Sequence, residues 1–174
     1  MHFNITMKSL FTFTVILLLL SVSTISFAQE NTRERGRGVY MELFGNGLGY
    51  SFNYDQRFDK RFDGLGFKAG LSYFAIDGNS VATLPVGLNY LLGKNGKYFE
   101  MGAGATFLRA EDSTNAFAVG DSRSVGTGTV GHMIFGYRRE PEEGGFLFRA
   151  SMTPLFGQGT FFPFWFGISL GYAF

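Results

Sequence analysis

One of the two histidines and two of the serines are candidates for covalent catalysis. His132 could act as a general base, and Ser151 or Ser169 could be the nucleophile on a neighbouring strand. Such a pair would support hydrolysis or transfer of an acyl group. The chain has no cysteine, so a thiol nucleophile is excluded.

Metal, cofactor and nucleic-acid sites have little support in the sequence. Without cysteine there are no thiolate ligands, and the carboxylates Glu140, Glu142 and Glu143 lie in a short segment typical of a solvated turn. The segment Gly45-Asn46-Gly47 contains the Asn-Gly pair of a hairpin turn and is not a phosphate loop. The formal net charge is only +1, which argues against a nucleic-acid partner. We therefore predict no metal, no cofactor and no nucleic acid.

A few charged residues occur on the small, polar face of otherwise apolar segments. Charges withdrawn from water must pair, or cost several kcal/mol each. We expect two acids and two bases to form a structural charge network in the interior of the protein, with an ion path as the functional alternative. Asp55 and Arg57 are expected on the same face, near one end. The four network residues are Glu42, Lys68, Glu100 and Arg149.

These residues lie in segments where large apolar side chains alternate with small or polar ones, which is the pattern of β-strands. From 162 to 174, every second residue is large and apolar, ending at Phe174, and the residues between are mainly small. Short charged or glycine-rich turns separate the segments, except for one sixteen-residue connection over 110–125. The predicted strands are 38–45, 47–58, 64–76, 81–92, 97–109, 126–138, 145–156 and 162–174.

The composition of the two strand faces separates a membrane barrel from a soluble sandwich. The outer face of a sandwich carries many charges, but here the non-apolar face is mainly Gly, Ser, Asn and Thr, and only 17% of the chain is charged. A small barrel has a narrow interior that such side chains fill, while its outside meets lipid. Four tyrosines also fall at one end of alternate strands, as in an interfacial aromatic girdle: Tyr54, Tyr90, Tyr137 and Tyr172. We predict an all-β, eight-stranded antiparallel up-and-down transmembrane barrel.

The N-terminus has the layout of a secretory signal. Lys8 precedes an apolar run of about eleven residues, which is shorter than the roughly 20 that a spanning helix needs. Small side chains at Ser26 and Ala28 predict cleavage before Gln29. The predicted organisation is a signal peptide over 1–28, a flexible N-terminal tail over 29–37, and a barrel over 38–174.

The strand pattern and the terminal Tyr172-Ala173-Phe174 resemble the small eight-stranded outer-membrane barrels of the outer membrane protein A and outer membrane protein X type. The phrase over 83–90 (TLPVGLNY) is similar to short barrels of the Bacteroidetes group. The resemblance implies a monomer in a Gram-negative outer membrane, in contact with its lipid and lipopolysaccharide. It also implies that the barrel-insertion machinery recognises Phe174. Both termini are expected in the periplasm, and the longest loop outside the cell.

The resemblance implies a non-enzymatic, porin-like envelope protein with a structural or surface-interaction role. The segment 110–125 is then the expected surface for a partner. Within the same class, the lipid A palmitoyltransferase is a barrel enzyme with His, Asp and Ser near its outer rim. The expected mid-barrel position of His132 does not match that rim, so no catalytic residue is predicted and a lipid-modifying enzyme ranks third.

Two prolines support the second-ranked function, which is binding or lateral transport of a small apolar ligand or lipid through the barrel wall. Proline cannot donate a ladder hydrogen bond, and a closed barrel has no edge strand that would tolerate it. Pro154 and Pro163 fall near the ends of adjacent predicted strands. Either the strands end there, or the prolines mark a lateral gap in the wall.

Overall fold

The computed structural model describes residues 34–76, 79–113, 123–157 and 159–174. The chain divides into two units, Met1–Thr32 and Arg33–Phe174. The first unit, with the predicted signal peptide over 1–28, lies outside the described residues, as does most of the predicted tail. None of the described helices is long and apolar enough to cross a membrane.

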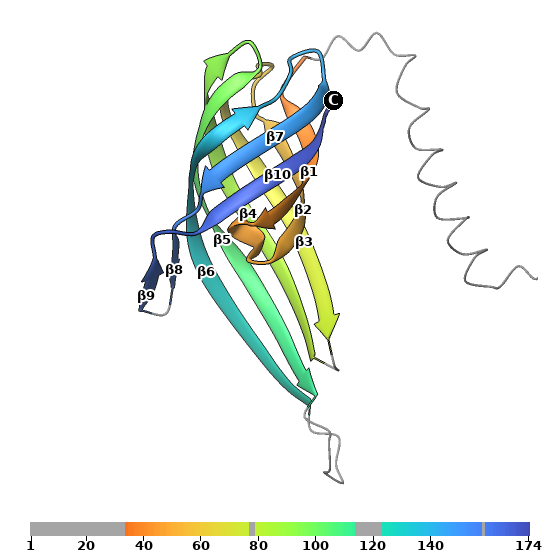
Figure 1. Ribbon diagram of the computed structural model, residues 1–174, viewed down its shortest axis with the longest axis vertical. Coiled ribbons are helices and arrows are strands. Elements are labelled where there is room, and N and C mark those ends of the chain that lie inside the picture. Colours follow the sequence, from red (N-terminus) through yellow and green to blue (C-terminus); the bar gives the residue numbers. More distant parts are fainter. Residues whose placement is uncertain (1–33, 77–78, 114–122, 158) are drawn as a thin grey trace, which may run out of the picture. The chain divides into compact units, whose positions relative to one another are not determined.

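The second unit is a closed antiparallel β-barrel (Figure 1). From β1 to β7 each strand pairs with the next one in the sequence, and β10 pairs with both β7 and β1, which closes the barrel. β8 pairs with β6 and with β9. The short strand β8 prolongs β7, and β9 prolongs β10. Each of these two pairs forms one stave of the wall, and each of the other six strands forms a stave by itself. The wall therefore has eight staves, and the predicted fold is confirmed. The elements are β1 Arg37–Phe44, η1 Gly45–Gly47, β2 Tyr50–Arg57, β3 Gly64–Ile76, β4 Asn79–Lys94, β5 Lys97–Ser113, β6 Arg123–Arg139, β7 Gly145–Met152, β8 Leu155–Gly157, β9 Thr160–Phe162 and β10 Phe166–Ala173.

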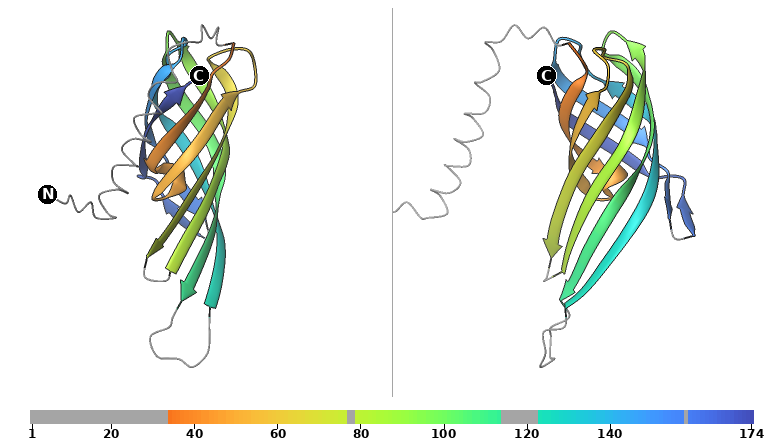
Figure 2. Two further views of the ribbon diagram at one scale, coloured as in Figure 1. Left: turned by 90° about the vertical axis from the view of Figure 1, so that its right-hand side faces the viewer. Right: turned by 180° about the vertical axis from the view of Figure 1, so that it is seen from behind.

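The strands differ in length, so the wall of the barrel is taller on one side than on the other. β4, β5 and β6 have 16 or 17 residues, whereas β1, β2, β7 and β10 have 8. The longer strands project past the shorter ones at the end opposite the C-terminus (Figures 1 and 2). β5 and β6 run further than predicted, so seven of the sixteen residues of the expected loop 110–125 are strand. The remainder, 114–122, lies outside the described residues.

The predicted strand 145–156 is interrupted at Thr153 and Pro154, because proline has no N–H for the ladder. Its register along β6 does not change: Phe135 faces Met152 and His132 faces Leu155. β8 therefore continues the line of β7.

The predicted strand 162–174 is divided by a β-bulge. Phe162 faces Leu155, and Phe166 faces Met152. Three residues, 163–165, thus oppose the two residues 153–154. An extra residue on one strand bends it and increases its twist. The bulge leaves β8 and β9 as a hairpin that diverges from the wall (Figure 1).

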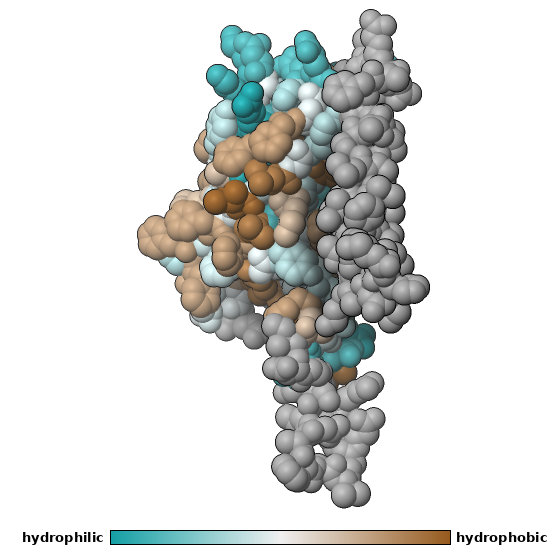
Figure 3. Space-filling model, turned by 45° about the vertical axis from the view of Figure 1, so that its right-hand side comes forward, coloured by the Kyte–Doolittle hydropathy of each residue, from teal (hydrophilic) through white to brown (hydrophobic). Residues whose placement is uncertain are grey.

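Apolar side chains cover the outside of the barrel and polar ones fill the inside. Along β10 the exposed residues are Phe166, Ile168, Leu170 and Tyr172, which alternate with small residues. The space-filling view shows a band of hydrophobic surface, with hydrophilic residues at the C-terminal end (Figure 3). An apolar exterior around a polar interior is the inverse of a soluble domain and suits a lipid surrounding.

Candidate functional site

The interior of the barrel holds the densest group of charged side chains. Within the described ranges, eight charged residues are at most 1% exposed. Four are acids and four are bases, so their formal charges cancel. They are Glu42, Asp55, Glu100, Glu140, Arg57, Lys68, Arg138 and Arg149.

Arg149 on β7 is the centre of one cluster. Its Nε and Nη2 donate to the two carboxylate oxygens of Glu100 at 2.7 and 2.8 Å, in a bidentate pair. Its Nη1 lies 3.4 Å from Glu42 Oε1 and 3.3 Å from Ser169 Oγ. The guanidinium also lies over the Tyr40 ring, 4.6 Å from its centroid. The structure thus brings together three of the four residues that the sequence singled out.

Lys68 is the fourth of those residues, and the structure does not bring it into the cluster. Its side chain points into the barrel from β3 and is 1% exposed. Its Nζ has no hydrogen-bond partner, and none of the salt bridges among the described residues includes it. Lys68 is therefore buried near the network without being bonded to it.

A second cluster, which the sequence did not predict as a unit, lies toward the C-terminal end. Arg138 donates to Asp55 Oδ1 at 2.9 Å and to Glu140 Oε2 at 2.7 Å. Arg57 donates to Asp55 Oδ1 and to Asn89 Oδ1, both at 2.6 Å. Asn89 returns a hydrogen bond to Asp55 Oδ2 at 2.7 Å. Every carboxylate in this cluster is paired.

The sequence predicts Glu140 in a solvated turn, but its side chain is fully buried. A period of two along β6 would have found it. His132 faces inward, so Arg138 and Glu140, which lie an even number of residues further on, face inward as well. Because Glu140 is followed closely by Glu142 and Glu143, the segment has the composition of a solvated turn, although Glu140 continues the inward positions of β6.

The hairpin turn Gly45–Gly47 forms as predicted, but it is folded into the barrel as the 3₁₀ turn η1. Gly45 has a φ of 55°, and a Cβ on it would lie 2.5 Å from the Glu42 carboxyl carbon. The flanking Phe44 and Leu48 adopt φ values of 60° and 71°, which are uncommon for such side chains. Four side chains bond the turn: Glu42 accepts from Asn46 N–H at 3.1 Å, and Thr106, Thr83 and Trp165 donate to the carbonyls of Asn46, Gly47 and Gly45 at 2.7, 3.3 and 2.9 Å.

The three residues considered for covalent catalysis are not brought together. His132 Nδ1 lies 3.2 Å from Thr106 Oγ1. Ser151 lies 3.5 Å from Thr153 Oγ1, and Ser169 bonds Arg149. No serine therefore forms a hydrogen bond to the imidazole among the described contacts. Among the described residues, no group of three or more His, Cys, Asp or Glu side chains could hold a metal ion.

The wall between β7–β8 and β9–β10 is hydrogen-bonded on both sides of Pro154 and Pro163. Thr153 N–H donates to Trp165 O at 2.6 Å, and Leu155 pairs with Phe162. The two prolines thus lie within the bulge. The free edge lies elsewhere: in the described part of the chain β9 pairs only with β8, and its other edge has no strand beside it.

The C-terminal residue is anchored to the first strand. Phe174 N–H donates to Arg37 O at 3.1 Å, and Arg37 Nε donates to Phe174 O at 3.0 Å. The Arg37 guanidinium also lies 5.2 Å from the centroid of the Phe174 ring. Phe174 therefore ends the seam at which the barrel closes.

The fold and the interior define the class of structure: a closed eight-stranded antiparallel barrel with a side-chain-filled polar interior and an apolar exterior. The crystal structure of the N-terminal β-barrel domain of Pseudomonas aeruginosa OprF is similar, with a TM-score of 0.56 and 13% sequence identity, over 82% of this chain and 98% of that chain. This likeness confirms the fold. No family model and no curated protein matches the chain, and the likeness to Bacteroidetes barrels stays a prediction.

Proposed function

We propose that the chain is a non-enzymatic integral outer-membrane barrel protein with an envelope-structural or surface-interaction role. The observation that carries this proposal is an apolar exterior around an interior filled by neutralised charge clusters and by η1. Eight staves enclose little more space than packed side chains occupy. With η1 bonded across that space, the barrel has the form of a closed membrane anchor.

In this proposal the C-terminal end faces the periplasm, and the projecting strands β3 to β6 face the outside of the cell. The exposed side chains of β10 meet lipid and, in the outer leaflet, lipopolysaccharide. Phe174 is the residue that the barrel-insertion machinery would recognise. The monomer would meet a surface partner through the segment 110–125, at the ends of β5 and β6.

Reconstitution tests this proposal. The refolded protein should migrate differently on gels before and after heating, and it should give no steady ion conductance in planar bilayers, because η1 and the charge clusters fill the interior. A steady conductance well above that of protein-free bilayers would refute the closed barrel and favour the ion path. Recovery of the native protein as a soluble monomer would refute the membrane placement itself.

A second function, binding of an apolar ligand through the wall, is favoured by the unpaired edge of β9 and the aromatic side chains around it. Phe161 and Phe164 are 62% and 77% exposed. The third function, a lipid-modifying enzyme, draws no support from the positions of His132, Ser151 and Ser169.

A further inference from the structure

An apolar pocket lies on the inner face of the β8–β9 hairpin. The cross-strand pairs Leu155–Phe162 and Gly157–Thr160 share this face, because residues paired across a ladder point to the same side. The pocket has a volume of about 190 Å³. It is lined by Leu48, Val130, Leu155, Phe156, Thr160 and Phe162.

The pocket is open toward the side of the barrel. β1 ends at Phe44 and β10 begins only at Phe166, so among the described residues no strand continues beside the outer edge of β9. The hairpin stands away from the wall in the front view and in the view from behind (Figure 1; Figure 2, right). A ligand in the surrounding membrane could therefore reach the pocket without crossing a hydrogen-bonded sheet.

The floor of the pocket is closed. Leu48 follows η1 directly, and η1 is held by Thr83, Thr106 and Trp165. Below it lie the charged clusters. A ligand that enters from the side is therefore stopped at η1, so the pocket is a binding site and not the mouth of a channel.

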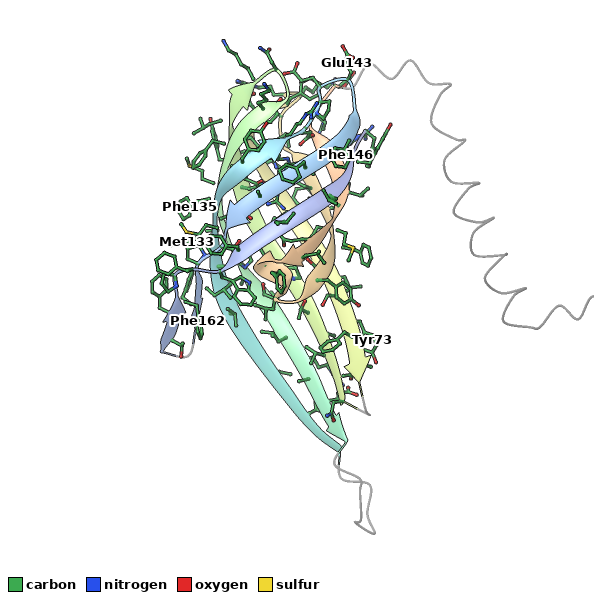
Figure 4. All side chains as sticks on the ribbon, viewed as in Figure 1. Tyr73, Met133, Phe135, Glu143, Phe146 and Phe162 are labelled. Atoms are coloured by element: carbon green, nitrogen blue, oxygen red, sulfur yellow. The ribbon has the colours of Figure 1, made fainter. Side chains whose placement is uncertain are left out.

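The pocket lies within the apolar band of the barrel. Phe162 and Tyr73, which are both well exposed, occur at a similar height, while Phe146 lies nearer the C-terminal end and Glu143 at that end (Figure 4). No charged side chain lines the pocket, and Thr160 supplies its one side-chain hydroxyl. A polar ligand would lose its hydration there without gaining hydrogen bonds.

We infer that this pocket binds the end of an acyl chain of a membrane lipid, which enters sideways past the free edge of β9. The inference rests on the proposed membrane placement and extends its second function by naming the site and the ligand. Burial of each methylene in an apolar site is worth about 0.8 kcal/mol, so a few carbon atoms suffice for a preferred position. The exposed phenylalanines of the hairpin would contact the remainder of the chain.

The test is photo-crosslinking in phosphatidylcholine vesicles that contain a palmitoyl chain with a terminal diazirine. Labelled residues are mapped by mass spectrometry. Ile168 on the lipid-facing wall serves as the internal reference. The proposal expects labelling of Leu155 and Val130, which face inward, as well as of Ile168.

Two variants fill the pocket, and one matched variant leaves it open. Val130→Phe adds a ring to its lining from β6. Thr160→Trp adds one from β9, which pairs only with β8 among the described strands, so this variant disturbs the barrel wall less. Either should reduce Leu155 labelling about tenfold relative to Ile168, since displacing two methylenes corresponds to roughly that factor. Val39→Phe, on the exposed wall of β1, should leave the ratio unchanged.

Three results would overturn the proposal. Labelling confined to Ile168 and other outward residues would leave the membrane barrel intact and remove the acyl-chain site. Unlabelled Leu155 together with a dimer on unheated gels would assign the pocket to a second copy of the chain. Absence of labelling at Ile168 itself would show that the wall does not face lipid, and the proposed membrane placement would fall with the pocket.

Discussion

The bidentate pair between Arg149 and Glu100 gives a quantitative test of the interior. Replacing Arg149 with methionine keeps most of the apolar stem and removes the guanidinium. Glu100 would lose hydrogen bonds of 2.7 and 2.8 Å, and Glu42 would lose its contact at 3.4 Å. Both carboxylates would remain buried, with fewer partners to offset their lost hydration.

The expected cost is large because a charge is orphaned. Breaking a buried pair by removal of one partner typically costs about 3–5 kcal/mol. Arg138 Nη1 is 3.9 Å from Glu100 Oε2, and Asn89 donates to Glu100 Oε1 at 2.7 Å, so part of the loss can be recovered. We therefore expect Arg149→Met to destabilise the barrel by about 3 kcal/mol, at the lower end of that range.

Lys68→Met is the matched control, because it removes one positive charge from the same interior without removing a hydrogen bond. Its stability should stay within about 1 kcal/mol of the parent protein or rise, since a buried charge without a bonded partner is itself unfavourable. Urea unfolding in lipid vesicles, followed by the fluorescence of the single tryptophan, Trp165, measures both variants. Equal losses for the two variants, or a larger loss for Lys68→Met, would refute the division of the interior into bonded and unbonded charges.

Two further predictions concern the packing of η1 and the N-terminus. Gly167→Ala should cost about 1–3 kcal/mol, because its Cβ would lie 2.8 Å from Gly45 Cα, whereas Gly126→Ala, which has open space, should be neutral in the same urea titration. A neutral Gly167→Ala would mean that η1 is not packed against β10. The mature protein should begin at Gln29 by intact mass spectrometry of outer membranes, and a chain that retains Met1 to Ala28 would contradict the predicted signal peptide.

The repeated alternation of side chains was sufficient to predict the barrel and most of its strands. The predicted bounds of β3, 64–76, agree with the structure, and the alternation of apolar side chains with small or polar ones runs unbroken from Leu65 to Tyr73. The inward positions of Glu42, Glu100 and Arg149 follow from the same period. Such a pattern is local, so it can be found in the sequence without knowledge of which strands meet.

Only the tertiary structure decided which charged residues bond to each other and where the wall ends. Arg138 and Asp55 are far apart in the sequence and meet because the stagger of the strands brings their side chains to one level. The register of β9 against β8 differs by one residue from that of β10 against β7, and this shift creates the bulge and the free edge. The sequence by itself determined which face each side chain occupies, because that depends on backbone geometry. Pairing, the inward fold of η1 and the open hairpin depend on strand register and length around the closed barrel, and these are set by contacts between distant segments.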